Sequence, residues 1–203
     1  CFSAALEINA ALDARSTVTI TPSSSAALEG AQVTPGSWDA MTVQERLDLL
    51  QAVLEEEQSR LALPHLELLS QDIEEDEVLA HYSRTQDGQA VITIDLEYLA
   101  VCSSQRALTS LCHEARHAYQ YYTVSLIDWD DPAIAASPYF ATARNWKGNF
   151  EGYTSGLDDY AGYFTQSIEL DARDYADRRA EYYLYILETG IRPASPPQGE
   201  AAG

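Results

Sequence analysis

The feature that most constrains this chain is the run Leu111-Cys112-His113-Glu114-Ala115-Arg116-His117-Ala118-Tyr119-Gln120. It contains the pattern His-Glu-x-x-His, and its apolar residues recur at helical spacing. On an α-helix, two residues four apart lie about 40° apart around the axis and one turn apart along it. The rings of His113 and His117 therefore face the same side, close enough together to bind one ion. Glu114 lies about 100° round the axis from His113, beside that ion.

This arrangement suits a divalent metal ion and a base that acts next to it. Two imidazoles on one helical face bind Zn²⁺ well, and a neighbouring carboxylate can take a proton from a water molecule that the ion polarises. We therefore predict His113 and His117 as zinc ligands and Glu114 as the catalytic base. The alternative is an exposed, charged helix face that carries two ordinary histidines.

A catalytic zinc site needs a third protein ligand, with water in the fourth position. No histidine follows His117 in the sequence. The third ligand is therefore a carboxylate or one of the upstream histidines, His65 and His81. We expect both of these histidines to be surface or sheet residues, because neither shares a helical face with the motif.

The favoured third ligand is Glu169, on the predicted final helix. Helical spacing places Glu169 with Ala172 and Ala176 in a mostly apolar arc. A carboxylate there loses hydration and needs a cation, and the small alanines would let this helix approach the motif helix closely. A glutamate at the rim of that face, reaching to water, is the structural alternative. The competing ligands are Asp128, Asp130 and Asp131, which are closer to the motif in sequence.

Length and charge limit the classes of function. The chain has 203 residues, enough for one domain with a substantial core, and 46% of them are hydrophobic. Acidic residues outnumber basic ones by 32 to 12, which gives a net charge of −20. Such a surface repels phosphate backbones and anionic lipids, so we expect no nucleic-acid partner. We also expect no membrane insertion, because no apolar run is long enough to span a bilayer.

The pattern of elements predicts an α+β fold. A capping box at Thr42-Val43-Gln44-Glu45 opens a helix that runs to about Leu61. Three strand-like segments follow, at about Leu66–Ser70, Val78–Ser83 and Ala90–Asp95. We expect them to form a small antiparallel sheet, and the apolar face of the motif helix to pack against this sheet.

Several further segments complete the prediction. The motif helix is expected over about Ser104–Tyr122, and Asp131-Pro132 starts another helix. A glycine-rich loop is expected over Trp146–Gly156. A long helix over about Asp158–Glu188, broken near Thr165–Gln166, closes the domain. Near the amino end we expect a helix over Phe2–Ala14 and a short strand at Thr17–Ile20.

The three cysteines contain no Cys-x-x-Cys pair, which excludes a cysteine-zinc site. We expect Cys112 to pack as a small buried hydrophobe, with a Cys102–Cys112 disulfide as the alternative. The first residue is Cys1 rather than Met. A fragment of a longer chain explains this better than the acylated cysteine of a processed lipoprotein.

Together these residues resemble the gluzincin branch of the zincin metallopeptidases, in which His-Glu-x-x-His is completed by a glutamate on a later helix. More narrowly, the motif run is similar to that of uncharacterised bacterial zincin-like domains, some of them toxin-associated. The other residues that carry this likeness are Trp146, Asn149, Tyr153 and Glu169-Leu170-Asp171-Ala172-Arg173. The resemblance covers about Ala90 to Glu188. It implies a zincin-like fold, with a sheet on the motif helix and a C-terminal helix that supplies Glu169.

The chain departs from the gluzincin pattern at one position. The pattern places an aspartate four residues after the ligand glutamate, where it orients a histidine. Here that position is Arg173, and Asp171 lies two residues earlier. The residue that orients the imidazoles is therefore left open.

We expect three regions, and the resemblance points to an exported protein. An N-terminal helix and loose connector is expected over 1–41, a zincin-like metallopeptidase domain over 42–192 and a disordered tail over 193–203. The likeness to toxin-associated domains points to a secreted protein or to part of a larger exported bacterial protein, although no signal peptide is visible.

The expected mechanism is peptide-bond hydrolysis. Glu114 removes a proton from a water molecule acidified by Zn²⁺ as that water attacks a peptide carbonyl, and then passes the proton to the leaving amine. The oxyanion is expected to be stabilised by one of three tyrosines, Tyr153, Tyr160 or Tyr163. By the resemblance, the strand Ala90–Asp95 is expected to pair with an extended peptide or protein substrate.

Two other functions compete with a zinc metallopeptidase. One is a non-catalytic zincin-fold module of a larger secreted or effector protein, in which zinc only joins helices. Glu114 favours the enzyme, because a structural site has no need for a base beside the metal. The other is metal-dependent cleavage of a transcriptional repressor, which is weakened because no basic patch or helix-turn-helix accompanies the motif.

Overall fold

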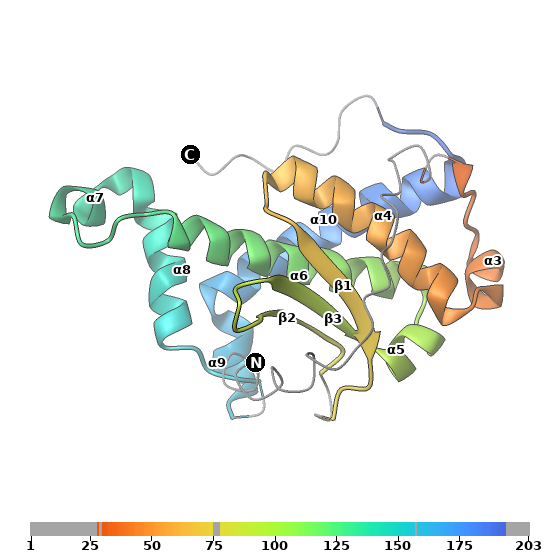
Figure 1. Ribbon diagram of the computed structural model, residues 1–203, viewed down its shortest axis with the longest axis horizontal. Helices are drawn as coiled ribbons and strands as arrows, with labels where there is room; N and C mark the ends of the chain where they lie inside the picture. The colour runs from red at the N-terminus through yellow and green to blue at the C-terminus, as the bar shows by residue number, and fades with distance from the viewer. Residues whose placement is uncertain (1–27, 29, 75–77, 157, 194–203) are drawn as a thin grey trace.

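A computed structural model describes residues 28, 30–74, 78–156 and 158–193. The described part is α+β, with many helices around one small sheet (Figure 1). The elements are α3 (Pro35–Ala40), α4 (Val43–Leu61), β1 (Leu66–Gln71), β2 (Ala80–Arg84), β3 (Ala90–Asp95), α5 (Leu96–Val101), α6 (Ser104–Ser125), α7 (Pro132–Ala136), η2 (Pro138–Phe140), α8 (Ala141–Glu151), α9 (Tyr160–Thr165) and α10 (Ser167–Thr189).

The sheet is mixed, with strand order β1-β3-β2. β3 runs parallel to β1 and antiparallel to β2. All three strands match predicted segments, but the prediction of an antiparallel sheet is wrong for the β1–β3 pair. Alternating apolar residues indicate which face of a strand is buried and not the direction of its neighbour. Only β2 and β3 form a hairpin, which turns at Gly88 with a φ of 87°.

β3 is the central strand of this sheet, so both of its edges are already paired. The prediction that a substrate adds to Ala90–Asp95 is therefore wrong, because its backbone groups already bond to β1 and β2. The edge strand β2 also contacts the motif helix. The backbone N–H of Tyr82 donates to Glu114 Oε2 of α6 at 2.7 Å.

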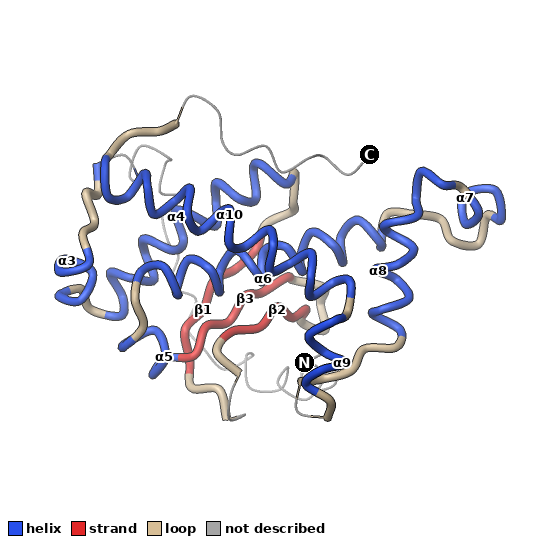
Figure 2. Tube along the Cα trace, turned by 180° about the vertical axis from the view of Figure 1, so that it is seen from behind, coloured by secondary structure: helices blue, strands red, loops and turns tan. Residues whose placement is uncertain are grey.

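The motif helix α6 lies between the sheet and α10 (Figures 1 and 2). Leu108, Leu111 and Ala115 are fully buried on its inner face, in one cluster with Ile92 and Ile94 of β3. This is the apolar face that the helical spacing predicted. The helix begins at Ser104 and is capped by Ser103, whose side chain accepts a hydrogen bond from the N–H of Arg106. It extends three residues beyond the predicted end, to Ser125.

The final helical segment is divided as the sequence predicted. α9 ends at Thr165 and α10 begins at Ser167, because Gln166 between them has an extended backbone. In α10, Ala172 and Ala176 are fully buried against the core. Their small side chains let α10 lie close to α6, which brings the first turn of α10 next to the motif.

The region predicted as the loop Trp146–Gly156 is helical in its first half. α8 continues to Glu151 and contains Gly148, which usually costs a helix about 1 kcal/mol relative to alanine. Packing outweighs this cost, because Ala143 and Trp146 are buried in a cluster with Ile168 of α10. The spacing of the glycines therefore led to a wrong prediction, because residues 146–151 are helical and were expected to form a loop.

The predicted helix starts at Thr42 and at Asp131-Pro132 are confirmed, because both positions cap the helices that follow. The segment before α4 contributes to the core through Trp38, whose ring N–H donates to the Cys102 carbonyl at 2.8 Å. Cys102 and Cys112 are buried free thiols, so the alternative of a disulfide between them is wrong. The helix expected over Phe2–Ala14, the strand at Thr17–Ile20 and the tail 194–203 lie outside the described residues.

A buried ionic cluster joins α10 to α4. Glu57 is fully buried, and its carboxylate accepts from Arg179 Nε at 2.7 Å and from the Tyr183 hydroxyl at 2.8 Å. The Tyr175 hydroxyl also donates to Glu57. Breaking a buried pair leaves an uncompensated charge, which is far more costly than losing a pair in water.

We therefore expect Arg179→Met to lower the free energy of unfolding by about 3–5 kcal/mol. The matched control is Arg178→Met on the same helix. Arg178 pairs with Asp174 in water, with exposed side-chain fractions of 43% and 66%, so its loss should cost about 0.5 kcal/mol or less. Urea titration of both variants measures the difference, and equal losses would contradict the assigned role of the cluster.

Candidate metal centre

A pocket opens beside α6, between β2, the end of α8, α9 and the start of α10. The motif residues His113, Glu114 and His117 form its floor, and Glu169 enters from α10. The other residues that line it are Ala80, His81, Tyr82, Phe150, Tyr153, Tyr163 and Ile168.

Three predicted ligands meet in this pocket. His113 Nε2 lies 3.3 Å from Glu169 Oε2, and His117 Nε2 lies 3.4 Å from Glu169 Oε1. The two ring nitrogens are 3.0 Å apart. The third-ligand prediction is therefore consistent with the geometry, because His113, His117 and Glu169 form a group that could hold a metal ion.

The spacing of these atoms fits a small tetrahedral cation. Nitrogen and oxygen ligands at about 2.0–2.2 Å from a tetrahedral Zn²⁺ lie about 3.3–3.6 Å from one another. The three measured separations of 3.0, 3.3 and 3.4 Å are near this range. Glu169 is 1% exposed, and its Oε2 is a buried oxygen that accepts no hydrogen bond from the described residues. A cation between the three side chains would satisfy that oxygen.

The electrostatics of the triad also favour a positive charge. Burial lowers the pKa of His117, but the hydrogen bond to Glu169 and the charges of Glu114 and Glu169 outweigh it and raise this pKa to about 9. Burial would raise the pKa of the Glu169 carboxyl, but the facing rings of His113 and His117 hold it far below its usual range. The pocket therefore stabilises a cation at the ring nitrogens, and a metal ion that binds there displaces a proton.

Glu114 lies in the same pocket but outside the ligand triad. It is 8% exposed, and the N–H of Tyr82 on β2 anchors its Oε2 at 2.7 Å. The sequence predicted a carboxylate beside a metal ion, and Glu114 lines the same pocket as the three candidate ligands. The bond to the strand fixes the direction of the carboxylate.

Gln120 holds the outer side of the His117 ring. His117 Nδ1 and Gln120 Oε1 are 2.9 Å apart. The amide nitrogen of Gln120 donates to the Ile168 carbonyl at 3.0 Å and to Asp171 Oδ2 at 2.7 Å. Gln120 is fully buried, so these contacts connect the motif helix to α10 out of reach of solvent.

Asp171 forms a two-bond ion pair with Arg116 of the motif. Arg116 Nε and Nη2 lie 2.7 and 2.9 Å from the two carboxylate oxygens. The guanidinium also lies over the rings of Tyr119, Trp146 and Tyr175, 4.7–5.5 Å from their centroids. The gluzincin pattern would place an orienting carboxylate at position 173. Here Asp171 contacts the amide of Gln120, and Gln120 contacts the His117 ring.

The first turn of α10 is fixed from the other side by α8 and the loop after it. Asn149 Oδ1 accepts from the Ser167 hydroxyl at 2.6 Å and from the Ile168 N–H at 3.2 Å. The Tyr153 hydroxyl donates to Glu169 Oε1 at 3.1 Å. Both residues belong to the set that carried the family resemblance, and both help to position the third ligand.

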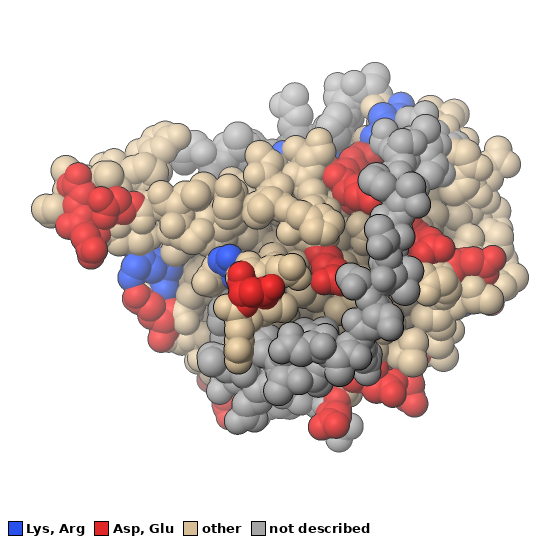
Figure 3. Space-filling view, in the orientation of Figure 1, with Lys and Arg blue, Asp and Glu red and all other residues tan. Residues whose placement is uncertain are grey.

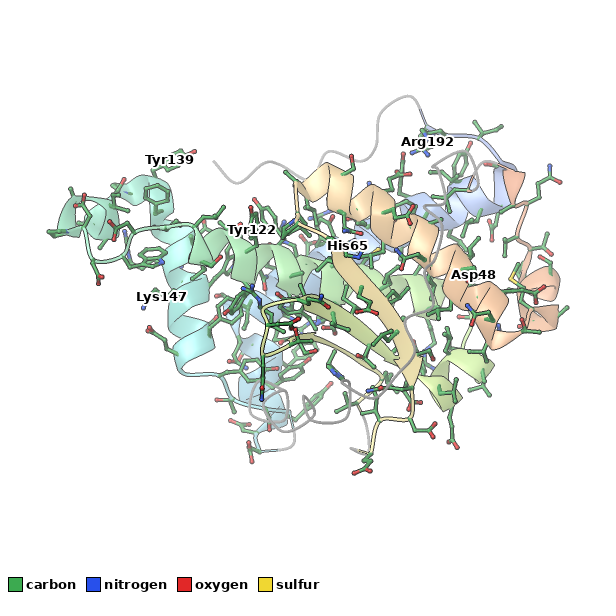
Figure 4. All side chains as sticks on the ribbon, in the orientation of Figure 1. Asp48, His65, Tyr122, Tyr139, Lys147 and Arg192 are labelled. Carbon is green, nitrogen blue, oxygen red and sulfur yellow. The ribbon has the colours of Figure 1, made fainter. Side chains whose placement is uncertain are left out.

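The competing ligands lie elsewhere. Asp128, Asp130 and Asp131 are exposed on the arm that carries α7, where acidic side chains gather at the tip (Figure 3). His65 is exposed just before β1 (Figure 4), and His81 lies on β2 and lines the pocket without joining the triad. The same arm carries Tyr139 away from the body of the molecule (Figure 4).

The contact between Gln120 and the His117 ring was not predicted from the sequence. Position 120 was compared only with the glycine that another zinc-protease pattern has there. The usable signal was its spacing, because residues three apart on a helix are neighbours and an amide there can reach an imidazole. Arg173 lies with Nη1 4.0 Å from Glu169 Oε2 and with its guanidinium over the Phe164 ring. It therefore contacts the ligand carboxylate and not a histidine.

No protein-family model, curated protein or solved structure matches this chain. Among the described helices, none combines the length and the apolar character that are needed to cross a membrane.

If the triad binds Zn²⁺, Glu169→Gln should weaken binding by more than about 100-fold, because losing a direct ligand exceeds the 10- to 100-fold typical of outer contacts. The matched control is Glu181→Gln, an exposed residue on the same helix. Zinc content after dialysis and the zinc-dependent rise in melting temperature measure the effect. Zinc bound equally by both variants would show that Glu169 is not a ligand.

Proposed function

We propose that this chain is a zinc-dependent metallopeptidase with a zincin-like fold. The observation that carries the proposal is the joint position of two groups: a set of three candidate ligands, of which Glu169 is buried, and a separate carboxylate, Glu114, which face one pocket. The resemblance to gluzincins supports the same function. The sheet beside the motif helix and the later helix with Glu169 are features that this resemblance implies.

In this proposal His113, His117 and Glu169 hold the zinc ion. Zinc supplies Lewis acidity towards a water molecule and a peptide carbonyl oxygen. Glu114 acts as the general base, taking the proton of the attacking water and transferring it to the leaving amine. The bond from the Tyr82 N–H holds one oxygen of Glu114 in the pocket.

We propose that the substrate is an extended peptide segment that lies along β2. β2 is an edge strand, and its residues Ala80, His81 and Tyr82 line the pocket. A peptide can add to such an edge through main-chain hydrogen bonds. This replaces the expectation that β3 pairs with the substrate.

Among the candidate oxyanion donors we propose Tyr163. Tyr160 is 68% exposed and does not line the pocket. The hydroxyl of Tyr153 already donates to Glu169. Tyr163 lines the pocket, and burial together with the charge of Glu169 raises its pKa, so the phenol keeps its proton for donation.

One observation favours the alternative, a zincin-fold module without catalysis. Glu114 accepts a hydrogen bond from the backbone of β2, so it also joins the sheet to α6. In a non-catalytic module this contact would be the reason for its presence. The two roles differ in what they require, because the contact needs only an acceptor oxygen and catalysis needs a base.

Glu114→Gln separates these roles, because the amide keeps an acceptor oxygen for Tyr82 and loses the base. We expect bound zinc and stability to stay near wild type, and the rate of cleavage of an unfolded protein substrate to fall about 10²- to 10⁴-fold. Zinc content, melting temperature and a cleavage assay give the three readouts. Cleavage at the wild-type rate would contradict the assigned base.

Tyr163→Phe tests the oxyanion donor. Removal of one such donor typically lowers kcat by about 10²- to 10³-fold. We expect this loss in kcat with zinc content unchanged, and we expect Tyr160→Phe, an exposed neighbour on α9, to behave as wild type. An equal effect of both substitutions would argue against Tyr163 as the donor.

A further inference from the structure

We propose that Gln120 is a positioning residue that sets the tautomer of His117, and that it is itself oriented by the Arg116–Asp171 ion pair. Gln120 takes the place of the carboxylate that usually contacts a metal-bound imidazole. The inference rests on the metal-binding part of the proposed function and not on hydrolysis.

The hydrogen bonds of Gln120 determine which end of its amide faces the histidine. On one side lie the Ile168 carbonyl and Asp171 Oδ2, at 3.0 and 2.7 Å, and both are acceptors only. The NH₂ group must face them, because the reversed amide would oppose its oxygen to two other oxygens in a buried position. The amide oxygen therefore faces His117 Nδ1 at 2.9 Å.

This orientation fixes the proton on the imidazole. An amide oxygen can only accept, so His117 Nδ1 must carry a hydrogen. In the neutral ring, the lone pair then lies on Nε2, the nitrogen that faces His113 and Glu169. When a metal ion displaces the proton on Nε2, the proton on Nδ1 stays in place, so the ring binds the ion in the correct tautomer.

The ion pair behind Gln120 makes its orientation rigid. Arg116 binds both oxygens of Asp171 and is itself held over the rings of Tyr119, Trp146 and Tyr175. Two motif residues, Arg116 and Gln120, and Asp171 of α10 thus act in series on His117: Arg116 fixes Asp171, Asp171 fixes Gln120 and Gln120 fixes His117. Arg173 takes no part in this chain of contacts.

An amide at this position also limits the negative charge of the site. Glu114 and Glu169 already place two carboxylates next to His117. A third carboxylate directly on Nδ1 would add repulsion among buried like charges. With Gln120 between them, the charge of Asp171 lies one side chain further away and is paired with Arg116.

The competing explanation is that Gln120 only joins α6 to α10 through the Ile168 carbonyl. The test uses Gln120→Leu, Gln120→Glu and the double variant Gln120→Glu/Asp171→Asn. The Glu substitution keeps the acceptor for His117 but opposes a carboxylate to Asp171. The double variant relieves this repulsion, because the new Asn can donate to the introduced carboxylate while the total charge stays unchanged.

The readouts are the affinity for Zn²⁺, by chelator competition, and ¹⁵N–¹H NMR of the His117 ring in the zinc-loaded protein. For Gln120→Leu we expect about 10- to 100-fold weaker zinc binding and loss of the slowly exchanging Nδ1 proton. For Gln120→Glu we expect weaker Zn²⁺ binding than in wild type. The double variant should bind Zn²⁺ at least about 10-fold more tightly than Gln120→Glu. A purely structural role would leave the Nδ1 proton signal protected.

Asn149→Ala is the matched control, because it loosens the start of α10 without contacting His117. We expect it to keep the Nδ1 proton signal. If Gln120→Leu keeps that signal and loses no more zinc affinity than Asn149→Ala, the positioning role is overturned.

If wild-type protein binds no Zn²⁺, the inference and the metal centre fail together. If wild type binds zinc and the Gln120 variants weaken this binding as expected, but wild type cleaves no peptide, the inference stands and only the peptidase proposal fails.

Discussion

The site depends on the burial of one carboxylate. Glu169 lies on the inner face of α10 and is 1% exposed. A carboxylate removed from water is costly unless positive charge or hydrogen bonds compensate it. Here the facing groups are two imidazoles and the Tyr153 hydroxyl. The need to compensate Glu169 explains why both histidines point to it, and the same need makes a divalent cation a suitable occupant.

Close packing of α10 against α6 brings Glu169 next to the two histidines. Polar contacts around these side chains then hold the two helices in place. The alanines at 172 and 176 are fully buried and allow the approach. Asn149 then fixes the start of α10, and Gln120 and Asp171 connect the two helices beside the pocket. The side chains of the candidate ligands are therefore held by groups on three elements and not by the motif helix alone, as a precise metal site requires.

The sequence predicted those parts of the structure that depend on local spacing. The placement of His113 and His117 on one face, the capped start of α4 and the break at Gln166 all follow from helical period or turn chemistry. The parallel β1–β3 pair and the helical state of α8 were missed, because they depend on contacts between distant segments. Glu169 could be chosen as a candidate ligand from its apolar surroundings on the predicted helix. The contacts of Asp171 could not be predicted, because they join two helices that are distant in sequence.

Burial alone does not identify an acidic side chain as a metal ligand, and α10 shows why. It contacts two buried glutamates, its own Glu169 and Glu57 of α4. Glu57 is neutralised by Arg179, a permanent cation, and is saturated by tyrosine hydroxyls. Glu169 instead faces two imidazoles, with the Arg173 guanidinium further away at 4.0 Å, and it borders a pocket, so its charge can be compensated by an exchangeable ion. The difference lies in the partners, and it separates a structural acid from a candidate ligand on one helix.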